Sequence, residues 1–425
     1  MSFVRVLASW LDNAPNAAPE ENATACDLRL FVGAENVCVH RDGAATSLAD
    51  SVAVSVYGLV ERLAHDWWHI FGGRAGPYRL MLRRAGFLLP DLRFYFDGGA
   101  FDVECLPYRY SGPDVSFIVG AREVLSRVDA EAVLGTFVGE TIQRLKATGI
   151  GESAASRRWD RVVESRQDPD EAAFCEAAGA LQVDPYRMDD ATTVLIERAG
   201  RLFEGESLIE FLAGASGGAH AGGAMEWVAK VEALPRYRSR LPALGGVASA
   251  ARLRAPNRPA ERTWALGYRR ARAARAALNL DQTARIGSVS GIAALFDSKS
   301  FKRAPHVGGL RAMIARDGTD VRVHLRDHAG GAAANAVELF AFGRAVGDAV
   351  CFPEGARAVV NDLRDASRQA AGRAFAAEFL APIDEIRCMS RDGKDLASIA
   401  DEFGVSTDVV SLQIENADRI AQACG

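Results

Sequence analysis

The sequence predicts an α+β protein built from two or three domains. The chain has 425 residues, 49% of them hydrophobic and 25% charged, which allows a substantial core. Short runs that alternate apolar and polar residues come first, and longer runs with helical spacing follow. We therefore expect a mixed α/β domain over residues 1–150, a helical region and linker over 151–250, and a C-terminal helical domain with a small sheet over 251–425.

Two strand pairs and one helix are expected in the first domain. The alternating runs at 26–32 and 35–41 predict one pair, and those at 92–99 and 101–110 predict a second pair around a Gly-Gly turn. Apolar spacing over 48–71 predicts a helix between them.

The middle of the chain has helical spacing over 130–150, 172–200 and 206–215. The Gly- and Ala-rich stretch at 213–224 has no Lys-Ser or Lys-Thr after it, so it fails as a phosphate loop and predicts a flexible connection. A second break at 242–261 contains three prolines and predicts the start of the last domain.

Positive charge is concentrated in one segment of an acidic protein. The net charge is −5, yet residues 230–303 hold sixteen Lys and Arg against four acids. A solvated helix whose charges pair with the acidic remainder would explain this segment. The other explanation is a phosphate-bearing partner such as nucleic acid. The arginines that would bind it are Arg262, Arg269, Arg270, Arg272 and Arg275.

The C-terminal part predicts a fixed order of elements. A helix over 264–281 is followed by strand-like runs at 307–316 and 320–327. Helices over 338–352 and 367–386 come next, and a helical hairpin over 395–416 ends the pattern.

Over residues 262–416 this order resembles the ImmA/IrrE family of zinc metallopeptidases. The most specific matching segment is Phe375-Ala376-Ala377-Glu378-Phe379-Leu380-Ala381-Pro382, which has the family's Phe-Ala, Leu and Pro at their usual spacing. The resemblance implies a zincin-like fold for this domain. It also implies a metal motif on the preceding helix.

The residues that should hold the zinc are missing. Family members place two His four residues apart on a helix, with a Glu beside the first as general base. Here the pattern falls on residues 340–348: Gly347 is kept, but the two His and the Glu are replaced by Arg344, Asp348 and Ala345. The third ligand's position falls on Gln369 or Ala371. We therefore expect no metal, no cofactor and no hydrolysis by this route.

Arg344 and Asp348 lie four residues apart on the predicted helix. This spacing predicts an ion pair that fills the space a metal would occupy, unless each residue fills that space with another partner. Alternatively, the C-terminal cleft binds an anion or a peptide carboxylate through Arg344.

The hairpin over 395–416 also has the apolar spacing of a helix-turn-helix. Its second helix carries Asp408 and Glu415 and no Lys or Arg, so it lacks the side chains that contact phosphates. We expect a structural hairpin that packs on the rest of the domain.

His65 and His69 are a second candidate for a metal site, because they lie four residues apart on a predicted helix. Asp66 stands beside the first His, but the sequence offers no third ligand, and Trp67 and Trp68 favour a packing helix.

The best-supported expectation is a catalytically inactive, peptidase-like binding protein of a bacterial regulatory, stress or defence system. Its partner protein or ligand would bind in the C-terminal cleft, and the resemblance implies a repressor-type DNA-binding protein as partner. One alternative is a nucleic-acid-binding regulator that uses residues 230–303, and another is a metallopeptidase with an unusual site at His65 and His69.

The sequence predicts a cytoplasmic protein with no membrane span. The longest apolar stretch, near residues 341–352, is interrupted by Arg344 and Asp348. The N-terminus has no sustained apolar run of a signal peptide, and seven scattered cysteines suggest no disulfide framework.

Overall fold

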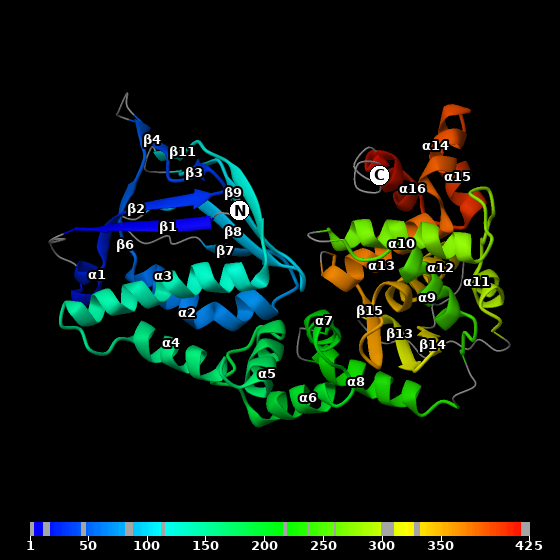
Figure 1. Cartoon of the computed structure of the whole chain (residues 1–425), viewed down its shortest axis with the longest axis horizontal. Coiled ribbons are helices and arrows are strands. Elements are labelled where there is room, and N and C mark those ends of the chain that lie inside the picture. The colour runs from blue at the N-terminus through cyan, green and yellow to red at the C-terminus, as the bar shows by residue number, and fades with distance from the viewer. Residues whose placement is uncertain are drawn as a thin grey trace. The chain divides into compact units, whose positions relative to one another are not determined.

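A computed structural model of the chain shows two compact units, Met1–Met188 and Asp189–Gly425 (Figure 1). Antiparallel sheets and helices of several lengths make both units α+β, as the sequence predicts. The structure describes residues 4–11, 18–43, 48–80, 88–111, 115–215, 219–235, 239–258, 261–298, 310–326, 332–364 and 366–417.

Antiparallel strands make up most of the first 125 residues. They are β1 (Val4–Trp10), β2 (Ala25–Val32), β3 (Glu35–Asn36), β4 (His40–Asp42), β5 (Leu48–Ala49), β6 (Val52–Ser55), β7 (Tyr78–Leu80), β8 (Asp91–Phe96), β9 (Phe101–Leu106), β10 (Tyr108–Arg109), β11 (Val115–Phe117) and β12 (Ala121–Leu125). One sheet has the order β1-β2-β3 with β6 also on β2, a second β12-β9-β8-β7, and a third β10-β11-β4-β5. The predicted pair β8 and β9 is confirmed, with Leu92 opposite Cys105.

Helices cover these sheets and complete the core of the N-terminal unit. They are α1 (Pro19–Ala23), α2 (Tyr57–Gly72), α3 (Arg127–Ala147), α4 (Ala154–Ser165) and α5 (Pro169–Ala180). α2 packs on β8, α3 packs on β1 and β12, and α4 and α5 both pack on α2. Trp67 and Trp68 of α2 are buried in this core, as their apolar character predicts.

The C-terminal unit consists of helices around a three-stranded sheet (Figure 1). Its helices are α6 (Asp190–Gly200), α7 (Glu206–Gly214), α8 (Ala219–Glu232), α9 (Leu244–Arg254), α10 (Thr263–Ala277), α11 (Val289–Leu295), α12 (Ala332–Cys351), α13 (Ser367–Leu380), α14 (Ile383–Arg391), α15 (Leu396–Phe403) and α16 (Thr407–Glu415). Its strands are β13 (Leu310–Asp317), β14 (Asp320–Leu325) and β15 (Arg357–Asn361), in the order β14-β13-β15.

Helix α12 lies at the centre of this unit. It packs on all three strands and on α13, while α10 crosses both α12 and α13. Close packing on α13 depends on Gly347, because a Cβ there would lie 2.7 Å from Cβ of Phe375. The kept glycine of the sequence pattern is therefore a helix-contact residue.

The hairpin α15–α16 packs on the unit's core, as predicted. Ile399, Phe403 and Val410 are fully buried in the same cluster as Phe342 and Phe375. Gln413 on α16 donates through Nε2 to the Ala381 carbonyl at 3.0 Å. These contacts fix the hairpin as part of the unit.

Several predicted elements differ from the structure. The strand predicted over 35–41 is divided between β3 and β4, which belong to different sheets, and the helix predicted over 367–386 is divided at Pro382 into α13 and α14. The helix predicted over 48–71 begins only at Tyr57, because Val52 and Val54 alternate inward and pair with β2 as strand β6. The connections predicted over 213–224 and 242–261 are largely helical. Burial of Ala224 and Met225 stabilises α8 despite two glycines, and Pro242 and Pro256 flank α9 instead of interrupting it.

The unit boundary also differs from the predicted boundaries at 150 and 250. The helical region 151–250 is shared, since α4 and α5 pack on α2 of the N-terminal unit, whereas α7 packs on β15 of the C-terminal unit. Among the described residues, no helix is long and apolar enough to cross a membrane.

Candidate functional site

Arg344 and Asp348 lie one turn apart on α12, and both are buried, with only 7% and 3% of their surface exposed. Their spacing predicts an ion pair, but that prediction is wrong. Each side chain turns to different partners among the residues that the structure describes. Their neighbours come from β13, β15, α13 and α7.

Asp348 is held by two arginines. Arg368 of α13 donates through Nε to Oδ2 at 3.0 Å and through Nη2 to Oδ1 at 2.9 Å, and Arg316 of β13 donates to Oδ1 as well. Burial alone would raise the pKa of Asp348, but the charges of Arg368 and Arg316 outweigh it and hold the pKa below its ordinary value. The carboxylate is therefore ionised and already saturated with donors.

Arg344 binds neutral oxygens. Its Nη2 donates to the Asn361 carbonyl at 2.6 Å and to Oε1 of Gln369 at 2.8 Å. Burial, together with the nearby charge of Arg373, lowers the pKa of this guanidinium well below its ordinary value, to about 9. The position where the resemblance implies a zinc-binding His thus holds a buried cation.

Glu210 of α7 completes the network, and sequence reasoning missed it. Its carboxylate accepts from Nε2 of Gln369 at 2.6 Å and from the backbone N–H of Arg368 at 3.0 Å. Its own carbonyl accepts from Nδ2 of Asn361 at 2.8 Å. The signal in the sequence was a lone acid inside the apolar run 208–212, because an acid on the buried face of a helix needs a partner.

The residues at the expected ligand positions do not fit a metal. Arg344 is not a ligand, Gln369 is bound to Arg344 and Glu210, and the Asp348 carboxylate is occupied by two guanidiniums. Across the described part of the chain, no three His, Cys, Asp or Glu side chains are grouped closely enough to hold an ion.

The five candidate arginines of the basic segment do not form a basic surface. Arg270 and Arg275 are buried, and their guanidiniums donate to backbone carbonyls, among them Val350 and Phe379. Arg269 is paired with Glu261 and Arg272 with Glu378, each at 2.6 Å. Arg262 is half-buried at the start of α10. Four of these five arginines thus have their charges engaged inside the unit, whereas Arg254 and Arg258 of the same segment are exposed.

A groove of about 410 Å³ runs over the outside of the same unit. Its floor includes Ala370, Ala374 and Ala377, which follow each other along one face of α13. Larger side chains and three charged residues form the walls. They are Trp264, Tyr268, Phe340, Val409, Leu412, Gln413 and Asn416, with Arg364, Arg373 and Asp408.

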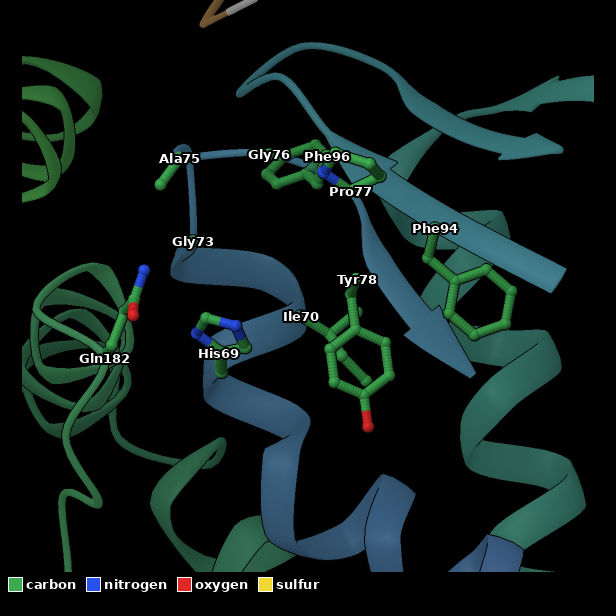
Figure 2. Close-up of a pocket in the computed structure, with 10 residues that line it drawn as sticks. All are labelled: His69, Ile70, Gly73, Ala75, Gly76, Pro77, Tyr78, Phe94, Phe96 and Gln182. Carbon is green, nitrogen blue, oxygen red and sulfur yellow. The ribbon is translucent and has the colours of Figure 1, made fainter. Parts of the chain in front are cut away.

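His65 and His69 lie on the face of α2 that borders two hollows in the N-terminal unit. Nδ1 of His65 lies 2.8 Å from Oδ1 of Asp66, and Nδ1 of His69 lies 3.4 Å from the Gly179 carbonyl. Figure 2 shows the His69 ring beside Tyr78, whose ring centroid is 6.0 Å away. Nδ1 of His65 thus contacts a carboxylate and Nδ1 of His69 a carbonyl, and no third ligand is grouped beside the two rings in the described residues.

No family model, no curated protein and no solved structure matched this chain when it was compared with each.

Proposed function

We propose that the protein is a catalytically inactive, peptidase-like binding protein that works in the cytoplasm of a bacterium, in a regulatory, stress or defence system. One observation carries this proposal. The places of the family's metal ligands are taken by a closed network in which Asp348 binds Arg316 and Arg368, and Arg344 binds Gln369. Such a network stabilises the fold but leaves nothing to activate a water molecule.

In this proposal the partner binds in the 410 Å³ groove described above, which we call the α10–α13–α16 groove. The interior around Arg344 is not available to the partner, because Asn361 and Gln369 occupy that space. Alanines on the floor of the groove admit side chains of a partner, and the aromatic rings of Trp264 and Tyr268 supply apolar contact. Leu412 on α16 is 56% exposed beside them. An apolar strip of this kind suits a peptide segment of a partner protein.

The charged residues on the walls of the groove indicate which kind of peptide segment would bind. Arg364 and Arg373 line the groove against a single acid, Asp408. A peptide with two or three apolar side chains and at least one Asp or Glu would match both features. The family resemblance makes a DNA-binding repressor a reasonable source of such a segment.

The two alternatives have less support. Nucleic-acid binding through the five candidate arginines would need exposed guanidiniums, yet Arg269, Arg270 and Arg275 are buried. A metallopeptidase at His65 and His69 would need a third ligand, which the described residues do not place there.

Metal analysis and peptide selection test the proposal together. Purified full-length protein should hold less than about a tenth of an equivalent of zinc, iron or manganese. Peptides selected from a random display library on the full chain should bind it and lose about tenfold or more in affinity with Leu412→Glu.

Leu253→Glu is the matched control, because Leu253 is 84% exposed on α9 and does not line the groove. It should leave peptide affinity unchanged. A full equivalent of metal would overturn the claim of inactivity. Peptides that bind Leu412→Glu as well as the wild type, or a selection that yields none, would reject the groove as the partner surface.

A further inference from the structure

Two adjoining hollows open in the N-terminal unit beside His69. One has a volume of about 230 Å³ and lies between the end of α2, the segment 73–78 and the end of α5. The other, of about 540 Å³, extends along the exposed face of α2 toward Arg62. His69, Pro77, Tyr78 and Gln182 line both, so the two hollows meet at these side chains. The larger hollow falls in the size range of small-molecule sites, and the smaller one lies just below it.

We propose that these hollows form one site for a nucleoside monophosphate, with the base in the smaller hollow and the phosphate in the larger one. This site is separate from the groove of the proposed function and does not depend on it. Three features carry the inference: the conformation of Gln182, the aromatic wall, and the exposed cations.

Gln182 adopts a backbone conformation that favours glycine. Its φ is +62° just after α5, where its N–H donates to the Gly179 carbonyl at 3.0 Å. A residue with a Cβ costs about 1 kcal/mol more than glycine in this conformation. The chain nevertheless has a glutamine here, and its amide lies at the wall of the smaller hollow, across from the His69 ring (Figure 2). An amide and an imidazole together offer donors and acceptors to a planar ring edge.

Aromatic rings form another wall of the smaller hollow. The Tyr78 and Phe94 rings are nearly parallel, with an interplanar angle of 11° and centroids 6.5 Å apart. Phe94 and Phe96 are each only 3% exposed, so Tyr78 offers the more accessible aromatic face of the hollow (Figure 2). A base that stacks on such a surface gains about 1–3 kcal/mol. A heteroaromatic ring with hydrogen-bonding edges satisfies both this surface and the Gln182–His69 pair.

Exposed cations line the larger hollow. The side chains of Arg62 and Arg79 are 43% and 50% exposed, although each also contacts a carboxylate, Asp66 and Asp91 respectively. The ring of His65 is exposed in the same hollow, with Nε2 3.9 Å from Oδ2 of Asp184.

The acids of this hollow already have protein partners. Asp66 accepts from the Tyr78 hydroxyl at 2.7 Å, and Asp184 accepts from Arg158 at 2.8 Å. Because the side chains of Arg62 and Arg79 are 43% and 50% exposed, a phosphate group would meet both guanidiniums and would compete with Asp66 and Asp91 for them.

Titration calorimetry on the full chain tests this proposal with AMP, GMP, CMP and UMP, with the matching nucleosides, and with inorganic phosphate. At least one monophosphate should bind about tenfold or more tightly than its nucleoside and than phosphate alone. Its affinity should fall with added salt. Arg79→Met should reduce the affinity for the monophosphate to about that for the nucleoside.

Gln182→Gly is the decisive variant, because it removes the amide and suits the left-handed backbone. Its melting temperature should be equal to or above that of the wild type, while affinity falls about tenfold or more. Asn279→Gly is the control: Asn279 has a φ of +54° at the end of α10 and lines neither hollow. It should leave affinity unchanged.

Three results would overturn the proposal. The first is no binding of any monophosphate at about 1 mM. The second is an affinity of the Gln182→Gly variant for the monophosphate that equals that of the wild type. The third is inorganic phosphate that binds as tightly as the nucleotides, which would leave only an anion site.

Discussion

Arg368 binds Asp348 through two parallel hydrogen bonds of 3.0 and 2.9 Å inside the C-terminal unit, although the two residues come from different helices. Arg316 donates to the same carboxylate from the sheet. One buried acid thus joins α12, α13 and β13, the three elements that meet at the centre of the unit. This arrangement occupies the place where the resemblance implies a metal, and it makes the replaced motif a structural element.

Asp348→Asn should destabilise the C-terminal unit by about 3–5 kcal/mol, because it leaves two buried guanidiniums without their counter-charge. Urea unfolding followed by the fluorescence of Trp227 and Trp264, which both lie in this unit, would measure the loss. Asp362→Asn is the control, since Asp362 is 58% exposed in its pair with Arg311 and should change stability by less than about 1 kcal/mol. Equal effects of the two changes would contradict the central role of Asp348.

Gly347→Ala should destabilise the same unit by about 1–3 kcal/mol. The added Cβ would lie 2.7 to 2.9 Å from three atoms of the Phe375 side chain, so α12 and α13 would have to move apart. Gly222→Ala in α8 meets no atom within 4 Å and should stabilise by up to about 1 kcal/mol. Circular dichroism melts of both variants would show the opposite signs.

The order of elements was predictable from the sequence because it depends on local periodicity. The helix of Arg344 and Asp348, the strands around Ile314 and Val323, and the hairpin at Phe403 all appear where apolar spacing places them. Strand β6 was missed, since its two inward valines form a strand only by pairing with β2.

The contacts within the site were less predictable. Periodicity placed Arg344 and Asp348 on one helical face. It could not show that their hydrogen-bonding groups would be occupied by Arg368 and Gln369, or that Glu210 would bind Gln369. These partners lie 20 to 159 residues away along the chain from the groups they bind. The count of charged residues over 230–303 does not show which arginines are buried. Burial of Arg270, for example, depends on carbonyl acceptors such as that of Val350, which lies far away in the sequence.

Arg270→Ala should lower the melting temperature of the protein and leave nucleic-acid binding unaffected. Its guanidinium donates to the carbonyls of Ala255, Val350 and Cys351. Val350 would keep a hydrogen bond from Arg252, but the other two carbonyls would lose their arginine donor, at a cost of about 1–3 kcal/mol. Arg254→Ala, at an exposed position of the basic segment, should leave stability nearly unchanged.

Fluorescence anisotropy with a labelled duplex and a labelled single strand gives the second readout for these variants. Wild-type binding that falls steeply with salt and disappears in Arg254→Ala would favour the nucleic-acid alternative instead.

Glu210 should make the C-terminal unit less stable as the pH rises above neutrality. Burial, together with the charge of Glu206, raises the pKa of its carboxyl from 4.5 to about 8, although the hydrogen bond from Gln369 opposes this rise. Because the folded pKa lies above the unfolded one, this group's contribution is fully present below pH 4.5 and is lost as the pH rises through about 8.

The free energy of unfolding should therefore fall by about 2 kcal/mol between about pH 6.5 and pH 8. Starting at this pH avoids His324, whose pKa is lowered to about 4 by burial and by Arg322. Glu210→Gln removes the titrating group, so the slope should flatten in this variant, whereas Glu204→Gln, at an exposed position, should keep it. Hydrogen exchange of the α7 and α13 amides at each pH would locate the loss. A slope that persists in Glu210→Gln would assign the pH dependence to another group.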